Sequence, residues 1–231
     1  MAGKIIENYQ YIGDPIGWGQ YSHVWLAQDL KKERQVAIKS SSHLNIAKKE
    51  SSVMKTYGTH PLLPQFYDFF IIDNRAYIVM EYFPGETIGH SNYYHKGKKR
   101  NIQEALLITL NILKGVQHLH NKGFAHSDLL PKNILIMKND PKKIKIIDFG
   151  LARPIEKIKY KYGDINAIVR MCIYLISGYA SENPFNDKDD QNNLELIDDK
   201  LKKALYKAVH PEEKNRYQSC EEFIDNLKTI M

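Results

Sequence analysis

One continuous stretch, residues 125–150, constrains what this 231-residue chain can fold into more than any other. Its sequence is AHSDLLPKNILIMKNDPKKIKIIDFG. Two apolar runs of strand composition, 134–137 and 144–148, flank the turn-forming segment KNDPKK, and this pattern predicts a hairpin. The hairpin would bring together three side chains that carry oxygen: Asp128, Asn133 and Asp148. Such hard ligands suit Mg²⁺ that also holds substrate phosphates, so the stretch predicts a site for Mg²⁺ and for the proton of a hydroxyl.

The composition is that of an ordinary globular protein, with 43% hydrophobic and 26% charged residues. This provides enough apolar material for a substantial core, and we expect one compact domain with two lobes. The formal net charge of +6 favours acidic partners or phosphate ligands in a general way. Because no basic-aromatic repeat or reader module accompanies the charge, a nucleic-acid partner is not expected.

The two cysteines, Cys172 and Cys220, lie far apart and flank no histidine at a metal-site spacing. We interpret them as buried or incidental thiols of a reducing compartment. No apolar run approaches the roughly 18 residues of a membrane helix, and the N-terminus lacks the apolar core of a signal peptide. We therefore expect a soluble, cytoplasmic protein without a membrane partner.

Two glycines mark a turn near the N-terminus, in the sequence IGWGQYSHV (16–24). Gly17 and Gly19 would let backbone N–H groups approach phosphates without obstruction by side chains. An ordinary hairpin turn also uses glycine, so the two glycines alone are weak evidence for a phosphate-binding turn. The segment VAIK (36–39) that follows them strengthens this interpretation. Lys39 ends this apolar segment, and its ammonium group could therefore be held at the wall of a cleft.

The expected partner of Lys39 is an acidic residue on the next helix, which the sequence places at 45–58. Glu50 lies on this helix next to an apolar stripe at helical spacing, formed by Val53, Met54 and Tyr57. The sequence therefore predicts that Glu50 emerges next to this core-facing stripe.

Residues 65–83 carry two further strand signals, and Pro84-Gly85 ends the second of them. The segment 101–122 has apolar residues at spacings of three and four with Asn101 as its N-cap, which predicts a long helix. We interpret the two histidines of this helix as ordinary helix residues. The helix would deliver the chain into the 125–150 stretch.

These motifs, in this order over residues 9–231, resemble the eukaryotic-type (Hanks-type) protein kinase family, as a compact member with a truncated activation segment. The resemblance implies that Asp128 accepts or orients the hydroxyl proton, and that Glu50 orients Lys39 toward the phosphates of ATP. The implied ligands of Mg²⁺ are Asn133 and Asp148. The nucleotide would also be contacted by Ile16, Gly17, Gly19, Val24, Ala37, Met80, Glu81, Phe83 and Leu135.

The same resemblance implies an α+β, two-lobed protein-kinase-like fold with ATP and Mg²⁺ in the cleft between the lobes. A small β-rich N-lobe would span about 9–82 and a larger helical C-lobe about 86–231, joined by a hinge at about 81–85. Two or three short helices are expected near the C-terminus, within 193–209 and 220–231, and the Asp-rich stretch 186–193 is expected to be a solvated loop.

Two departures from the family pattern lie within the catalytic loop. Leu130 stands where serine/threonine kinases of the family usually carry lysine, and we expect Lys132 to supply the missing positive charge. Ser127 replaces the arginine that binds a phosphate on the activation segment. Residues 151–176 contain no Ser or Thr, so an activation-loop Ser/Thr switch is not expected.

A third departure concerns the segment after Asp148. Asp164 follows within a helical pattern that resembles the family helix whose aspartate holds the catalytic loop, and the intervening A-P-E motif is missing. Arg216, which would pair with the glutamate of that motif, is left without an obvious partner. A partner protein could complete the acceptor site.

The leading function is ATP-dependent phosphorylation of a protein hydroxyl, with Ser/Thr favoured over Tyr, on a protein substrate of unknown identity. Three alternatives stay open. One is a small-molecule kinase of aminoglycoside-phosphotransferase type, and another is the small atypical kinase and ATPase of the tRNA-modifying KEOPS complex. The third is a pseudokinase scaffold that binds nucleotide without turnover.

Overall fold

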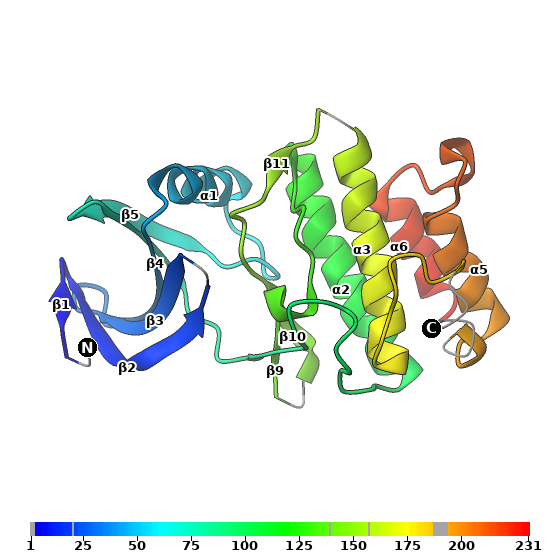
Figure 1. Cartoon of the computed structure of the whole chain (residues 1–231), viewed down its shortest axis with the longest axis horizontal. Coiled ribbons are helices and arrows are strands. Elements are labelled where there is room, and N and C mark those ends of the chain that lie inside the picture. The colour runs from blue at the N-terminus through cyan, green and yellow to red at the C-terminus, as the bar shows by residue number, and fades with distance from the viewer. Residues whose placement is uncertain (1–2, 20, 139, 157, 187–193) are drawn as a thin grey trace. The chain divides into compact units, whose positions relative to one another are not determined.

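The structure is a computed structural model, and it describes residues 3–19, 21–138, 140–156, 158–186 and 194–231 (Figure 1). The chain forms two compact units. The first unit comprises Met1–Pro84 and Asp148–Leu151, and the second comprises Gly85–Ile147 and Ala152–Met231. None of the described helices has the length and apolar character that a membrane crossing requires.

The first unit is an antiparallel sheet with one helix. Its elements are β1 (Ile5–Ile6), β2 (Tyr9–Trp18), β3 (Ser22–Asp29), β4 (Arg34–Ser41), α1 (Leu44–Tyr57), β5 (Phe66–Ile72) and β6 (Arg75–Glu81). The strands lie in the order β1-β2-β3-β4-β6-β5. Asp73 and Asn74, both with positive φ (49° and 56°), join β5 to β6. A two-residue turn of this handedness matches the twist of the strands that it connects.

The two faces of this sheet have different roles. One face forms an apolar core from Tyr9, Tyr11, Trp25, Ala27, Val36, Ile38, Tyr77 and Val79. Residues paired across two strands share a face, and side chains alternate along each strand. Val24 is paired with Lys39, and Ala37 with Met80. Consequently these four residues lie together on the face opposite to the core.

Helix α1 packs against β5 and β6 and confirms the helix predicted at 45–58. Its buried residues include the predicted apolar stripe and the one acidic residue of the helix, Glu50. Gly58, with φ of 72°, lies directly after the last helical residue. Glycine adopts a positive φ without the steric cost that a side chain would bring, so it allows the chain to leave the helix here.

The second unit is mainly helical. Its elements are β7 (Glu86–Thr87), α2 (Ile102–Asn121), β8 (Phe124–Ala125), η1 (Pro131–Asn133), β9 (Ile134–Met137), β10 (Asp140–Ile146), β11 (Arg153–Pro154), α3 (Ile158–Ser177), α5 (Asp199–Ala208), η2 (Glu213–Asn215) and α6 (Cys220–Lys228). Helix α2 packs against α3, α6 and β10 (Figure 1). The predicted N-cap is confirmed, since the Asn101 side chain accepts a hydrogen bond from the Glu104 N–H at 2.8 Å.

Two boundaries differ from the sequence prediction. The second strand of the hairpin runs from Asp140 to Ile146 rather than over 144–148, because a register shift lengthens it at one end and Asp148 leaves it with φ of 68°. The helical segment predicted at 193–209 is interrupted, because residues 194–195 are helical but residues 196–198 are not. Asp198 caps α5 by accepting from the Lys200 and Leu201 N–H groups, so that helix begins at Asp199. Residues 187–193 of the predicted Asp-rich loop lie outside the described residues.

Candidate active site

The first unit contains a three-membered charge cluster around Lys39. Strand β4 carries Lys39 on the sheet face opposite to the core, and its Nζ lies 2.8 Å from both carboxylate oxygens of Glu50. The same Nζ lies 2.8 Å from Oδ1 of Asp148. The predicted Lys39–Glu50 contact is therefore present, and Asp148 joins it.

Burial and charge act against each other in this cluster. The Lys39 side chain is 12% exposed and that of Glu50 is 3% exposed, whereas that of Asp148 is 39% exposed. Burial lowers the pKa of Lys39, but the charges of Glu50 and Asp148 outweigh it and leave this pKa above its usual value. Burial raises the pKa of Glu50, although Lys39 opposes the shift. The ammonium group therefore stays charged, and Asp148 is the carboxylate that faces solvent.

The segment Asp148–Gly150 is fixed to α1. The Phe149 N–H donates to Oε1 of Glu50 at 3.4 Å, and the buried Phe149 ring lies 5.0 Å from the ring of Tyr57 between centroids. The Gly150 N–H donates to Oδ1 of Asp148 at 3.3 Å. Asp148 has a left-handed backbone, which is uncommon for a residue other than glycine.

Several residues predicted to contact the nucleotide share the sheet face of Lys39. Val24, Ala37 and Met80 lie on this face, and Gly17 is paired with Val24 across β2 and β3. Ile16 is half exposed and lies where the β2–β3 pairing is irregular.

The glycine turn and the end of β6 complete the first unit's part of the predicted set. The Gly19 N–H donates to the Ser22 carbonyl at 2.8 Å, and a side chain at Gly19 would approach the Ser22 hydroxyl to 2.8 Å. The Glu81 N–H donates to the Gln65 carbonyl at 2.8 Å, so this N–H is already used. Phe83 follows β6 and is partly buried.

The second unit contains the other predicted residues. Asn133 uses its side-chain nitrogen twice on Asp128, donating to the main-chain carbonyl at 2.8 Å and to Oδ2 at 2.9 Å. Asp128 is thereby held in one orientation. Leu135 lies on β9, paired with Lys145 of β10 and with Thr87 of β7. Lys132 is exposed on η1.

Asp164 of α3 holds the start of the catalytic loop. Its Oδ2 accepts from the His126 N–H and its Oδ1 from the Ser127 N–H, each at 2.8 Å. Ser127 has φ of 64°, a left-handed conformation. The buried His126 ring is fixed at both nitrogens, by the Asp128 N–H at 3.3 Å and the Ile147 carbonyl at 3.1 Å. The hydrogen bonds from the His126 and Ser127 N–H groups to Asp164 thus hold the catalytic loop, as the resemblance implies.

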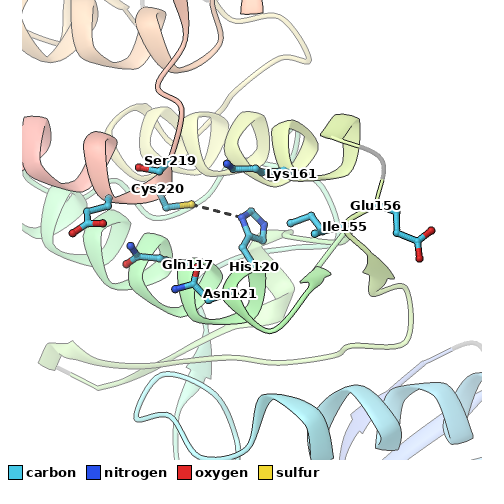
Figure 2. Close-up of a pocket in the computed structure, with 9 residues that line it drawn as sticks. Gln117, His120, Asn121, Ile155, Glu156, Lys161, Ser219 and Cys220 are labelled. Carbon is cyan, nitrogen blue, oxygen red and sulfur yellow. Dashed lines mark hydrogen bonds between the residues drawn. The ribbon is translucent and has the colours of Figure 1, made fainter.

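His120, interpreted from sequence as an ordinary helix residue, belongs to this network. Its Nε2 lies 2.8 Å from Oδ2 of Asp164, and its Nδ1 lies 3.7 Å from Sγ of Cys220. Figure 2 shows the side chains of His120 and Cys220 facing each other. Both line a pocket of about 410 Å³, together with other residues of α2, α3 and α6 and with Ile155 and Glu156. Burial raises the pKa of the Cys220 thiol to about 12, so the thiol is protonated and can donate to His120.

Arg216, predicted to lack a partner, is in fact engaged. Its Nε donates to the His210 carbonyl and its guanidinium to the Pro211 carbonyl, and its Cζ lies 4.6 Å from the ring centroid of Tyr162. Main-chain carbonyls and an aromatic ring take the place of the missing carboxylate. Because neither a main-chain carbonyl nor an aromatic ring is a charged residue, these partners of Arg216 could not be found by looking for an acidic side chain in the sequence.

Comparison with known proteins identifies the family. Residues 11–165 match the protein kinase domain. The chain is 33% identical to the probable serine/threonine-protein kinase YbdM of Bacillus subtilis over 178 residues, 71% of this chain and 68% of YbdM. It is 32% identical over 205 residues to the serine/threonine-protein kinase PrkC of the same organism, 85% of this chain but 31% of PrkC.

A solved structure shows the same fold. The crystal structure of the Mycobacterium tuberculosis PknI kinase domain superposes with a TM-score of 0.76 at 19% identity, covering 100% of this chain and 99% of that one. This likeness confirms the predicted α+β protein-kinase-like fold. Together with the two relatives, it confirms the resemblance inferred from the motifs: the chain belongs to the protein kinase family, among relatives named as serine/threonine kinases.

Proposed function

We propose that the chain transfers the γ-phosphoryl group of ATP to a Ser or Thr hydroxyl of a protein substrate. ATP-dependent phosphorylation of proteins is the activity of the family to which the chain belongs. The observation that carries the proposal is the contact of Lys39 with both Glu50 and Asp148, since it fixes a cation beside a solvent-facing carboxylate.

The residues present fit ATP and Mg²⁺. Asp148 offers a partly exposed carboxylate next to a charged ammonium. The side-chain nitrogen of Asn133 donates to Asp128, and the side-chain amide oxygen remains as a hard ligand for Mg²⁺. In the proposal, Lys39 binds the α- and β-phosphates, and Asp148 and Asn133 hold Mg²⁺. The metal would neutralise the charge on the phosphates, which is much of what phosphoryl transfer requires.

The nucleotide base would contact the sheet face that carries Val24, Ala37 and Met80, on the same side as Lys39. Flat apolar walls suit a purine, and hydrogen bonds to main-chain groups fix the orientation of the base. We assign these hydrogen bonds to the Glu81 carbonyl and to Phe83. The remaining contacts are assigned to Ile16, Gly17, Gly19 and Leu135.

Asp128 is the proposed residue that orients the acceptor hydroxyl and takes its proton. As the hydroxyl oxygen bonds to the γ-phosphorus, the bond from that phosphorus to the bridging oxygen breaks and ADP leaves. Asn133 restrains the Asp128 carboxylate through its bond to Oδ2. Such restraint favours reaction because it fixes the geometry beforehand. We assign to Lys132 the positive charge that Leu130 cannot supply, and near-normal transfer by Lys132→Ala would remove that assignment.

The relatives favour a protein kinase over the small-molecule and KEOPS-type alternatives, since both YbdM and PrkC carry the name of serine/threonine-protein kinase. Residues 151–176 contain no Ser or Thr. We therefore propose an enzyme without an activation-loop Ser/Thr switch, and a partner protein could complete its acceptor site.

Incubation with γ-labelled ATP and Mg²⁺ tests the proposal, using casein as acceptor and Asp148→Asn as the matched variant. We expect label on casein or on the chain itself, in phosphoserine or phosphothreonine, and its loss in the variant. Free phosphate without protein label would favour an ATPase instead. ATP binding with neither product would favour the pseudokinase scaffold.

A further inference from the structure

A second pocket, of about 380 Å³, lies beside Asp128 within the second unit. Part of its wall is one face of α3, because its residues there recur at helical spacing: Tyr160, Gly163, Asp164, Ala167 and Arg170. The catalytic-loop residues 127–130 form another part. Tyr93 connects α3 to the catalytic loop. Its hydroxyl donates to the Leu129 carbonyl, and the hydroxyl oxygen lies 3.1 Å from the carbonyl oxygen of Ala167.

The charges of this pocket are unbalanced. Three cationic side chains line it: Arg153, Lys159 and Arg170. Across the described ranges, no carboxylate forms an ion pair with any of the three. The two acids of the lining are Asp128 and Asp164, and Asp164 is already occupied by the N–H groups of His126 and Ser127 and by His120. The pocket therefore offers positive charge to a ligand next to Asp128.

Two polar atoms of the lining are buried and unsatisfied. Ser127 Oγ and Arg170 Nε have no hydrogen-bond partner in the part of the chain that the structure describes. Buried polar groups in folded proteins are almost always hydrogen-bonded, so each exception calls for a ligand or another explanation. Both atoms belong to residues of the same pocket. The lining therefore includes two donors to which the described residues offer no acceptor.

Arg170 is held in a fixed place for such a contact. Its Cζ lies 4.5 Å from the ring centroid of Tyr93, and the Tyr93 ring packs edge-on against Tyr174. A stacked guanidinium keeps its planar donor edge available, and that edge matches the geometry of carboxylate and phosphate groups. Arg153 lies nearby, with its guanidinium 3.3 Å from the Tyr160 hydroxyl.

We propose that this pocket binds a carboxylate or phosphate group of the segment that carries the acceptor hydroxyl, so that the protein selects acidic or already phosphorylated acceptor segments. The inference rests on the proposed function, because it assigns the pocket beside Asp128 to the acceptor. Arg170 and Ser127 are the central binding residues, and Arg153 and Lys159 add positive charge.

The test compares serine peptides in an alanine-glycine background that differ at one flanking position, which is Glu, phosphoserine, Gln or Arg. Wild-type protein should phosphorylate the best Glu or phosphoserine peptide at least about tenfold faster in kcat/KM than its Gln counterpart, the ratio that one charge-assisted hydrogen bond provides. The difference should lie in KM. Arg peptides should be the poorest, and inorganic phosphate should inhibit by competing with the acidic peptide.

Arg170→Met keeps an apolar chain against Tyr93 but removes the charge, and it should bring the Glu-to-Gln ratio close to one. Arg170→Lys should retain part of the preference. Lys159→Gln changes an exposed residue, so it tests the pocket even if Arg170→Met folds poorly, and it should reduce the ratio severalfold. Lys203→Gln on α5, also exposed, is the matched control and should leave the ratio unchanged.

Calorimetric binding of the Glu and Gln peptides separates this inference from the proposed function. Tighter binding of the Glu peptide that Arg170→Met abolishes, with no transfer to any peptide, would support the anion pocket and count against the kinase activity. Equal rates for Glu and Gln peptides would overturn the anion pocket and leave the activity standing. The pocket would also be overturned if Arg170→Met and Lys159→Gln kept the full preference, or if neither peptide bound.

Discussion

Lys39 and Glu50 form a buried two-point ion pair, with the lysine Nζ 2.8 Å from each carboxylate oxygen. The pair joins β4 to α1, and through Asp148 it also holds the Asp148–Gly150 segment. The ammonium group of Lys39 thus holds two carboxylates that come from distant parts of the sequence. Both the stability of the first unit and the proposed nucleotide contact depend on this arrangement.

Lys39→Met should destabilise the protein because it leaves Glu50 buried without its cation. Breaking a buried pair in this way typically costs about 3–5 kcal/mol, and urea unfolding measures the loss. The double variant Lys39→Met, Glu50→Leu should recover most of that stability, since apolar replacements of a buried pair are often neutral. Neither variant should transfer phosphate. A single variant as stable as wild type would contradict the pair as described.

Asp164→Asn should loosen the start of the catalytic loop. The amide would retain one oxygen for the N–H groups of His126 and Ser127, which in the wild-type protein donate to separate carboxylate oxygens of Asp164. Hydrogen exchange at these two amides should accelerate about tenfold or more, since an unsatisfied buried donor costs about 1–3 kcal/mol. Asp199→Asn, at an exposed position of α5, is the matched control. Unchanged exchange at both amides would contradict the holding role.

The buried tyrosines should set the response to alkaline pH. Burial raises the pKa of Tyr9, Tyr11 and Tyr217 to about 12 in each case. A phenol whose pKa is raised by folding contributes stability that is complete below the unfolded value of about 10. This contribution is lost as the pH rises through 12. Near-ultraviolet absorbance should show a late titrating group of tyrosines that shifts to about 10 in urea. Early titration of all tyrosines in the native protein would contradict their burial.

Both thiols should be unreactive in the native protein. Burial raises the pKa of Cys172 to about 11 and that of Cys220 to about 12. Since the thiolate is the nucleophile, a disulfide reagent at neutral pH should modify neither residue until the protein unfolds, when both react. Rapid modification of Cys220 would show that the pocket around His120 opens in solution.

The buried side of α1 could be predicted from a local pattern, whereas the fold and the Lys39–Glu50 contact were implied by the resemblance to the kinase family. An apolar strand ends at Lys39, and an apolar stripe at helical spacing fixes which side of α1 carries Glu50. The ordered motifs then indicated the family, which the comparisons confirm.

The network around Asp164 could not be predicted in the same way. His120 is 44 residues from Asp164 and 100 residues from Cys220, and the three lie on different helices. Periodicity gives the buried face of each helix but not the register of one helix against another. For the same reason, the sequence did not reveal that Arg170 and Ser127 line one pocket.

The proposed transfer activity, with Asp128 as its base, is tested most directly by a single-turnover measurement on wild-type protein and Asp128→Asn, with ATP affinity measured on the same samples. Wild-type protein should transfer phosphate, and the variant should be slower by about a hundredfold or more, the usual contribution of a positioned acid–base residue. ATP affinity should be the same in both. Transfer by Asp128→Asn at the wild-type rate would contradict the proposed role of Asp128. ATP binding by wild type without any transfer would contradict the proposed activity.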